Sequence, residues 1–439
     1  MVPQWIIEKK RDGQPLTADE IRAFIGGYAR GTVPDYQMAA LAMAIYFQGL
    51  NDEELAALAD AMLRSGKTLN TSAIPVSKID KHSTGGIGDK VSLILAPLVA
   101  CCGVAVPMIS GRGLGLTGGT LDKMESIPGY RADLSVARFL EVLGQCGCSI
   151  VGQTAELAPA DKKLYALRDV TGTVPSIPLI AASIMSKKLA EGLDGLVLDV
   201  KCGSGAFMKN PNRARALAQA ITDIGQRMKT PVVALITDMN QPLGRTVGNA
   251  LEVAEAVETL RGQGAPDLLA VTLALATEML LLAGIADTAE TAETLLRKQL
   301  DSGAAFENFK AMVRLQGGDP AALDEPARLP AATFEMDVPA PCAGYVERVD
   351  PEKIGKACLL LGAGRREVAG TIDPAVGVAG LVKIGEPVEA GQPLMVAHAN
   401  SEELLEQADP LLTGAVTVAS EPVAVPNPIL ETLRPANNI

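Results

Sequence analysis

The chain has 439 residues, 48% hydrophobic and 21% charged, so it can bury a large core in two or three globular domains. Its 39 basic and 51 acidic residues give a net charge of −12, and only 3% of its residues are aromatic. An acidic chain with few aromatic rings repels phosphate backbones and offers few stacking surfaces, so the composition argues against a nucleic-acid partner.

Residues 1–66 are predicted to be helical. Residues 1–10 lack the basic-then-apolar order of a secretory signal, and seven cysteines without a CxxC motif fit reduced thiols, so we expect a cytoplasmic protein. Thr17 and Glu20 match a capping box, and residues 34–48 carry an almost continuous stripe of Ala, Leu and Met. We expect these helices to form a homodimer, although a stripe that packs only in the core has the same pattern.

Short apolar runs alternate with helical segments in the middle of the chain. These runs lie at residues 78–80, 104–109, 150–151, 196–200 and 232–236. The alternation predicts an α/β sheet, in which ligands bind at the carboxyl ends of the strands. Residues 161–192 interrupt it with helical periodicity, and we expect them to pack on the N-terminal helices, so that two lobes enclose one cleft.

The remaining segments complete the predicted architecture. Residues 268–286 are the most apolar stretch, but their polar residues and helical periodicity indicate a buried helix and no membrane span. Beyond a proline-rich linker at 326–344, short β-rich runs include a turn at 385–394 that resembles a barrel-sandwich hammerhead without its acceptor lysine. The predicted fold is α/β, with a helical lobe, an α/β lobe with a mixed sheet and a small β-rich C-terminal domain. The expected boundaries are 1–66 plus 161–193 for the helical domain, 67–160 plus 194–330 for the α/β domain, and 331–439 for the C-terminal domain.

Two glycine-rich loops with hydroxyl side chains follow the first two predicted strands. Loop one, residues 80–92, offers Lys81, Ser83 and Ser92, and loop two, residues 110–125, adds Ser110 and Thr120. Glycines let the backbone approach an anion, and N–H groups, hydroxyls and an ammonium then replace its water shell. Neither loop is a Walker sequence, so the pair predicts one small phosphate site and no triphosphate hydrolysis.

A third group of residues suits a planar ligand. Ser183 and Lys187 are four residues apart and share a helix face, and Arg168 would reach them from the preceding helix. Such donors suit carbonyl oxygens that gain negative charge, although a solvated Lys-Lys face is an equal alternative for this segment alone. His82, one of two histidines, lies inside loop one, where it could donate to a leaving group in its neutral or protonated form.

Four stretches together resemble the thymidine and pyrimidine-nucleoside phosphorylase family. They read KHSTGGIGDKVS, SGRGLGLTGGTLDKMESIPGY, YALRDVTGTVPSIPLIAASIMSKKLAEG and LDVKCGSGAFM, in the family's order and spacing. The resemblance implies a class II-like nucleoside phosphorylase fold, whose lobes close over phosphate and nucleoside. It further implies that phosphate attacks C1′ of the sugar with inversion, with inorganic phosphate as co-substrate and no cofactor.

The resemblance also implies a role for each matched residue. Phosphate would be held by Lys81, Ser83, Ser92, Ser110 and Thr120. The pyrimidine would be held by Arg168, Ser183 and Lys187, with His82 near its 2-oxo group. The catalytic residues would be His82, Arg168 and Lys187.

Three positions bear on the subtype within that family. Leu116 stands where relatives usually have histidine, so the contacts of loop two near the base change. Met108 resembles the thymidine phosphorylase form and offers no hydrogen bond to a ribose 2′-hydroxyl. Lys90 resembles the thymidine enzymes too, whereas relatives with threonine there bind potassium, so a lysine ammonium would replace that ion. The alternative, a potassium site, would consist of Gly88, Lys90, Leu243, Thr246 and Glu255.

The expected activity is reversible phosphorolysis of thymidine, and of deoxyuridine, to free base and 2-deoxy-α-D-ribose 1-phosphate. Three alternatives stay open from the sequence. The first is a broad-specificity enzyme that also acts on uridine, and the second is an inactive nucleoside-binding paralogue, for which Leu116 would be the sign. The third is a magnesium-dependent phosphoribosyltransferase related to the anthranilate enzyme.

Overall fold

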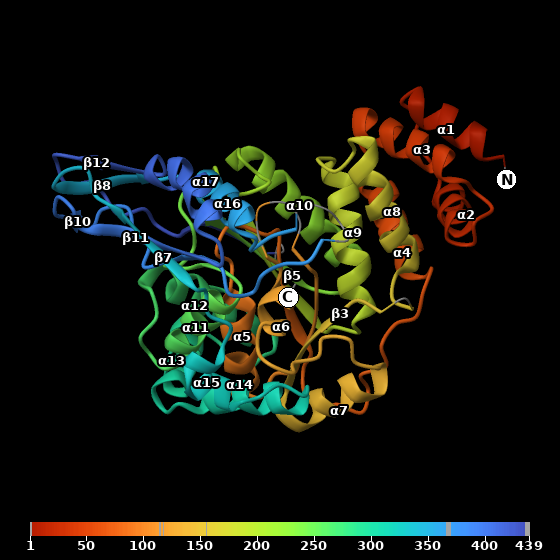
Figure 1. The fold of residues 1–439 in the computed structure, drawn as a ribbon. Helices are drawn as coiled ribbons and strands as arrows, with labels where there is room; N and C mark the ends of the chain where they lie inside the picture. The colour runs from red at the N-terminus through yellow and green to blue at the C-terminus, as the bar shows by residue number, and fades with distance from the viewer. Residues whose placement is uncertain (1, 114–115, 117, 155, 366–369, 435–439) are drawn as a thin grey trace.

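The computed structural model describes residues 2–113, 116, 118–154, 156–365 and 370–434, and it has three parts (Figure 1). A helical lobe contains the N-terminus, an α/β lobe lies beside it, and a β-rich domain projects from the opposite side. The predicted fold class is thereby confirmed.

Six helices form the helical lobe. They are α1 (Pro3–Arg11), α2 (Ala18–Ala29), α3 (Asp35–Gln48), α4 (Asp52–Leu63), α8 (Pro159–Thr171) and α9 (Ile177–Ala190). The predicted capping box at Thr17 is present, because its side chain accepts from Glu20 N while the Glu20 carboxylate accepts from Thr17 N. α8 and α9 pack on the N-terminal helices, although more than ninety residues separate them from α4 in sequence.

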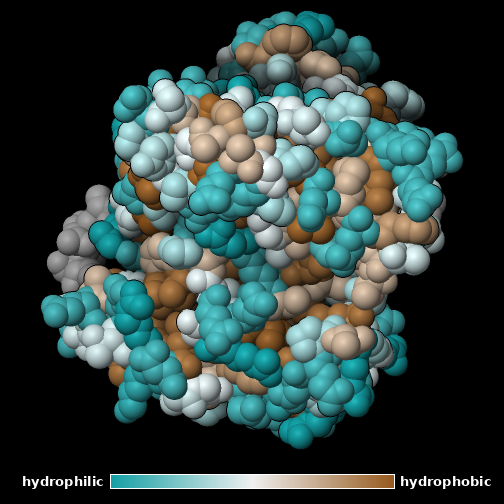
Figure 2. Space-filling model, turned by 60° about the vertical axis from the view of Figure 1, so that its left-hand side comes forward, coloured by the Kyte–Doolittle hydropathy of each residue, from teal (hydrophilic) through white to brown (hydrophobic). Residues whose placement is uncertain are grey.

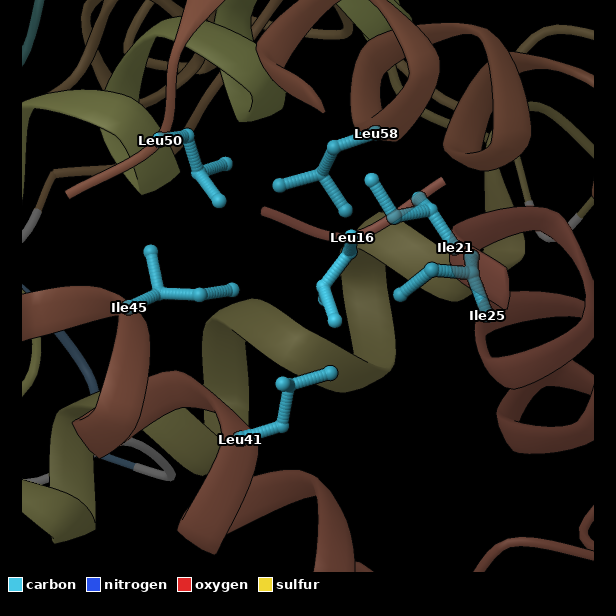
Figure 3. A pocket seen from close by; sticks show the side chains of 7 residues that line it. All are labelled: Leu16, Ile21, Ile25, Leu41, Ile45, Leu50 and Leu58. Atoms are coloured by element: carbon cyan, nitrogen blue, oxygen red, sulfur yellow. The ribbon is translucent and has the colours of Figure 1, made fainter. Parts of the chain in front are cut away.

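The interior of the helical lobe contains a small apolar cavity (Figure 3). Its volume is about 10 Å³, and it is lined by Leu16, Ile21, Ile25, Leu41, Ile45, Leu50 and Leu58. A void of this size with only aliphatic walls has no polar partner for a water molecule. It is a packing feature of the core and not a ligand site.

A mixed sheet forms the centre of the α/β lobe. β1 (Ile79–Ser83), β4 (Gly195–Cys202) and β5 (Val232–Asp238) are parallel neighbours. β2 (Val106–Ser110) and β3 (Cys148–Gly152) form a second parallel pair, and a bridge between Lys78 and Ala105 joins it to the start of β1. The helices of this lobe are α5 (Val91–Ala100), α6 (Thr120–Glu125), α7 (Val136–Cys146), α10 (Pro211–Arg227), α11 (Ala250–Leu260), α12 (Pro266–Leu282), α13 (Ala289–Asp301), α14 (Ala304–Leu315) and α15 (Ala321–Asp324). α12 is the buried helix expected at 268–286, and no helix in the described part of the chain is long and apolar enough to cross a membrane.

The described residues of the C-terminal domain form two small sheets and two helices. Its elements are β7 (Phe334–Pro339), β8 (Gly344–Val349), α16 (Pro351–Leu361), β9 (Gly377–Ala379), β10 (Pro387–Val388), β11 (Pro393–Ala399), α17 (Glu402–Thr413) and β12 (Val416–Ala419). β6 (Val247–Gly248), which precedes α11, pairs with β9 and so joins this domain to the α/β lobe. Figure 2 shows the molecule turned so that the side of the C-terminal domain comes forward, and the surface seen there is largely hydrophilic, with apolar groups between the hydrophilic ones.

The last strand does not join the C-terminal domain that was expected to span residues 331–439. β13 (Ile429–Leu433) leaves the C-terminal domain and pairs antiparallel with β5, so it is an edge strand of the α/β sheet. An ion pair of 2.7 Å between Arg215 of α10 and Glu431 holds it there. The strand satisfies backbone groups that the edge of β5 would otherwise expose.

The chain crosses between the helical and α/β lobes at three places that lie together. Lys67 N donates to Glu156 O at 2.8 Å, and Leu69 N donates to Ala190 O at 2.8 Å. A Cβ on Gly66 would lie 2.3 Å from Glu156 O, so only glycine allows this close approach. The three crossings therefore form one connected region between the lobes.

Candidate active site

The ends of β1 and β2 bring the two predicted phosphate loops together. β1 carries Lys81, His82 and Ser83 at its carboxyl end, and β2 ends at Ser110. Lys188 of α9 joins the two strands, because its Nζ lies 2.5 Å from Asp80 Oδ2 and 2.9 Å from Ile109 O. The loops that follow both strands therefore begin from one fixed point.

Loop one gathers its donors around a carboxylate. Lys81 Nζ lies 3.4 Å from Ser92 Oγ and 3.9 Å from Asp89 Oδ1, while Ser83 Oγ donates to Asp89 Oδ2 at 2.6 Å. Burial opposes ionisation of Asp89, but the charges of Lys81 and other nearby lysines outweigh it, so the pKa of Asp89 lies well below its usual range. The structure thus brings Lys81, Ser83 and Ser92 together as predicted from the sequence. Asp89 orients these side chains and was not predicted from the sequence. The available clue was the presence of an acidic residue within a loop that is otherwise rich in donors to an anion.

Loop two is ordered from within by Asp122. Its Oδ2 accepts from Gly113 N at 2.7 Å and from Gly119 N at 3.0 Å. Ser110 precedes this turn and Thr120 follows it, and both are partly exposed. Lys123 Nζ donates to Asp89 O at 2.6 Å, which ties loop two to loop one.

Ser183 and Lys187 lie on one face of α9, as their spacing predicted. Lys187 Nζ donates to Ser183 Oγ at 2.7 Å and to Asp161 Oδ2 of α8 at 2.7 Å. The lysine is therefore held by specific partners, and the alternative of a freely solvated Lys-Lys face does not describe this segment. Asp161 was not named from the sequence, although residues 161, 165 and 168 recur at helical spacing, which was the available signal.

Arg168 is buried beside this group and is bound to backbone carbonyls. Its Nη1 donates to Leu179 O at 3.1 Å and its Nη2 to Val174 O at 2.6 Å. Its Nε is buried and has no hydrogen-bond partner among the described residues. Desolvation lowers the pKa of Arg168, and the charge of Asp161 opposes that shift. The guanidinium is fixed in place by both terminal nitrogens, and its Nε–H remains available as a donor.

His82 lies between the two groups of donors. Desolvation, followed by the charges of Lys188, Lys187 and Lys81, lowers the pKa of His82 well below its usual value. These lysines belong to the α9 side and to the phosphate side of the site. A neutral imidazole at this position can donate one hydrogen bond at neutral pH.

Comparison with known proteins identifies the domains of the chain. Residues 4–66 match the model of a glycosyl transferase family helical bundle domain, and residues 76–306 match that of a glycosyl transferase family a/b domain. Residues 345–419 match the pyrimidine nucleoside phosphorylase C-terminal domain. The pyrimidine-nucleoside phosphorylases of Staphylococcus aureus strains USA300 and bovine RF122 / ET3-1 are each 51% identical over 419 residues, which covers 95% of this chain and 96% of theirs.

The chain belongs to the pyrimidine-nucleoside phosphorylase family. The predicted family is thereby confirmed, and with it the class of enzyme, a pentosyltransferase. Anthranilate phosphoribosyltransferase from Thermus thermophilus is similar in fold, with a TM-score of 0.58 and 20% identity over 71% of this chain and 98% of that one. At this identity the likeness extends to the fold alone.

The two positions that bear on sugar and base preference, Leu116 and Met108, face the protein interior. Leu116 is partly buried and packs on α16, where a Cβ on Gly355 would lie 3.0 Å from the Leu116 Cβ. Met108 is 1% exposed in the core of the α/β lobe. Leu116 thus joins loop two to the C-terminal domain through an apolar contact, and Met108 presents no polar group to the site.

The five residues named for a potassium site lie together, with the Lys90 ammonium among their oxygens. Lys90 Nζ donates to Leu243 O at 3.0 Å, Thr246 O at 3.0 Å and Glu255 Oε2 at 2.6 Å. Gly88 has φ +76°, and a Cβ there would lie 2.6 Å from Leu243 O. A tethered cation therefore fixes the end of loop one against residues 243–246.

Proposed function

We propose that this protein catalyses the reversible phosphorolysis of pyrimidine nucleosides, with thymidine and deoxyuridine as preferred substrates. The observation that carries the proposal is the placement of neighbouring residues on α9. Lys187 bonds to Ser183 of its own helix and to Asp161 of α8, while Lys188 anchors both strands that lead into the phosphate loops. One helix thus sets the distance between a base-binding group and a phosphate-binding group.

The proposed reaction is a displacement at the anomeric carbon. An oxygen of phosphate, held by Lys81, Ser83, Ser92, Ser110 and Thr120, bonds to C1′ as the C1′–N1 bond breaks. The bonding electron pair moves onto the pyrimidine, which leaves as an anion and then takes a proton, and the sugar leaves as a pentose 1-phosphate. Lys187 and the unused Nε of Arg168 act mainly in the transition state, where negative charge grows on the base. Neutral His82 donates to the 2-oxo group.

The preference for deoxyribonucleosides rests on Met108, which offers no hydrogen bond to a 2′-hydroxyl. Purified protein should release base from thymidine and deoxyuridine only when phosphate is present, and faster than from uridine. Equal rates with uridine would favour the broad-specificity alternative. Tight thymidine binding without turnover at millimolar phosphate would favour an inactive binding protein, and a strict need for magnesium would favour phosphoribosyl transfer. Serine-to-alanine substitution at Ser110 should raise the KM for phosphate more than that for the nucleoside.

We further propose that Lys90 takes the part of a bound potassium ion and that no cofactor is needed. Its ammonium bonds to two carbonyls and a carboxylate, a set of oxygens that also suits a monovalent cation. Activity in sodium buffer should equal activity in potassium buffer at the same ionic strength. A rate that depends on potassium would contradict this proposal while leaving the phosphorolysis intact.

We propose a homodimer that acts in the cytoplasm and is formed through α1 and α3. The chain has one Trp, six Tyr and seven Phe, yet Trp5, Tyr36, Tyr46 and Phe47 are all exposed on these two helices. Aromatic residues are enriched at protein–protein interfaces, and exposed ones on two helices that pack on each other indicate one here. Phe47→Glu should give a monomer in light scattering, whereas Val425→Glu, an equally exposed position in the C-terminal domain, should leave the mass unchanged. A wild-type monomer would contradict the proposal.

A further inference from the structure

The phosphate loop rests on a segment that the C-terminal domain holds from its other side. Residues 241–246, here called the bridging segment, follow β5 and contact loop one. Leu243 N donates to Ile87 O at 3.0 Å, and Lys90 Nζ bonds to the carbonyls of Leu243 and Thr246. The position of residues 87–90 is therefore set by the bridging segment.

Lys383 of the C-terminal domain binds the opposite side of the bridging segment. Its Nζ lies 2.5 Å from Pro242 O, 3.0 Å from Gly244 O and 2.7 Å from Asp267 Oδ2. Alternate carbonyls thus point in opposite directions, with those of Pro242 and Gly244 toward Lys383 and that of Leu243 toward Lys90. Two lysine ammoniums from different domains hold one short stretch of backbone between them.

The turn that carries Lys383, residues 381–386, is joined to the bridging segment along its length. Ile384 N donates to Gln241 Oε1 at 3.1 Å, and Leu381 N donates to Arg245 O at 3.0 Å. Glu386 pairs with the Arg245 guanidinium and also accepts from Lys383 N at 2.9 Å. The turn is therefore a fixed support rather than a loose contact between domains.

Burial makes the Lys383 ammonium difficult to replace. The residue is 8% exposed, and a buried cation is stable only where oxygen atoms take the place of its water. Its loss would leave Asp267 without its ion-pair partner and two inward-facing carbonyls without a donor. Of the carbonyls of residues 242–244, only that of Leu243 would then keep an ammonium donor, and residues 87–90 would rest on a less rigid base.

We propose that Lys383 is a positioning residue for the phosphate loop, through which the C-terminal domain takes part in phosphate binding. The inference rests on the proposed phosphorolysis for the identity of the anion. Lys383 acts through the bridging segment and Lys90, so its loss should affect phosphate and leave the pyrimidine group on α8 and α9 unchanged. A role limited to attaching the C-terminal domain would not distinguish between the two substrates.

The test compares Lys383→Ala with Lys356→Ala, a lysine of the same domain that is exposed on α16 and pairs with Glu352 at 2.8 Å. Lys383→Ala should raise the KM for phosphate about tenfold while the KM for thymidine stays within about twofold. Propylammonium, which matches the deleted atoms, should partly restore the phosphate KM of this variant and have no effect on wild type. Lys356→Ala should behave as wild type.

Three results would overturn the inference. These are an unchanged phosphate KM in a folded Lys383→Ala protein, an equal rise in both KM values, or no rescue by propylammonium. If Lys383→Ala does not fold, Glu386→Gln tests the same turn, because it weakens the partly exposed pair between Glu386 and Arg245. This variant should also raise the KM for phosphate. An unchanged phosphate KM in Glu386→Gln would refute the inference as well. Calorimetric titration with inorganic phosphate measures the same effect without turnover, so inactivity of the wild-type protein would count against the proposed function and not against this role of Lys383.

Discussion

Lys188→Met would remove an ammonium that two buried carboxylates share. Lys188 Nζ lies 2.5 Å from Asp80 Oδ2 and 2.8 Å from Glu191 Oε1, and Lys188 is 1% exposed. Burial and the charge of Asp80 raise the pKa of Glu191 well above its usual value, although Lys188 opposes the shift. The shift favours the protonated form of Glu191, and the Lys188 charge balances Asp80. The variant would leave Asp80 as a buried charge without a partner.

The structure sets the size of the expected effect. Breaking a buried ion pair by removing one partner costs about 3–5 kcal/mol, and methionine retains most of the apolar stem, so the unfolding free energy should fall by about that amount. Lys187→Met is the matched control on the same helix. The Lys187 side chain is 22% exposed, so water can partly solvate the partners it leaves, and the stability loss should be smaller. Lys187→Met should nevertheless lower turnover by orders of magnitude, because the proposed role of Lys187 is to stabilise the departing base.

Urea unfolding followed by circular dichroism, repeated across pH, measures the effect. The unfolded chain releases the Glu191 proton above about pH 4.5, whereas the folded state binds this proton more tightly. The stabilisation from this proton is therefore complete below about pH 4.5 and is lost as the pH rises through the folded pKa. Without Lys188 the pKa of Glu191 should rise further, so the deficit of the variant should be constant where Glu191 is protonated in both folded proteins and should grow as the pH rises through the folded pKa of the wild type. A deficit below about 1 kcal/mol, or one that shrinks as the pH rises through the folded pKa of Glu191, would refute the reasoning. So would a double variant with Asp80→Asn that recovers none of the loss.

Three other predictions follow from single residues. His82 should stay neutral as the pH falls below about 6.5, where the unfolded chain takes up a proton, so acidification should lower the free energy of unfolding. The NMR signal of the His82 ring, assigned by comparison with His82→Asn, should not titrate in its usual range. A normal titration would contradict this prediction. Gly88→Ala should raise the KM for phosphate about tenfold, because φ is positive there and the added Cβ would lie 2.6 Å from Leu243 O; an unchanged value would mean that loop one tolerates the strain. Leu58→Ala should lower the unfolding free energy by about 2–5 kcal/mol, because Leu58 lines the core cavity of Figure 3. Neither KM should change, because this cavity lies in the helical lobe and the phosphate loops lie in the α/β lobe. A selective change in the KM of one substrate would contradict the separation of the cavity from the site.

The parts of the site that the sequence predicts are those with a local pattern. Loop one groups Lys81, Ser83 and Ser92 within twelve residues, and the spacing of Ser183 and Lys187 is one turn of helix. In both cases the distance along the chain determines the distance in space. The helix and strand assignments of the α/β lobe could be predicted for the same reason, because each depends on a period within one segment.

The partners of these residues could not be predicted in the same way. Asp161 lies 26 residues before Lys187, and Asp80 lies 108 residues before Lys188, so no helical or strand period relates them. The return of β13 to the α/β sheet has the same origin, because the free edge of β5 exists only after the sheet has formed. Long-range pairing of this kind depends on the assembled fold and not on local propensity.

The buried lysines explain how an acidic protein can bind a phosphate. Each of several lysines around the phosphate loops has a carboxylate close by, as in Lys123 with Glu252 at 2.7 Å and Lys201 with Asp199 at 2.7 Å. The charges around the site therefore nearly cancel, and bulk attraction cannot be what selects the anion. What remains is the fixed direction of the donors, which each carboxylate maintains by holding a lysine or hydroxyl in one orientation. A network that binds through direction rather than net charge must be rigid, and that requirement accounts for supports as distant as Lys188 in the helical lobe and Lys383 in the C-terminal domain.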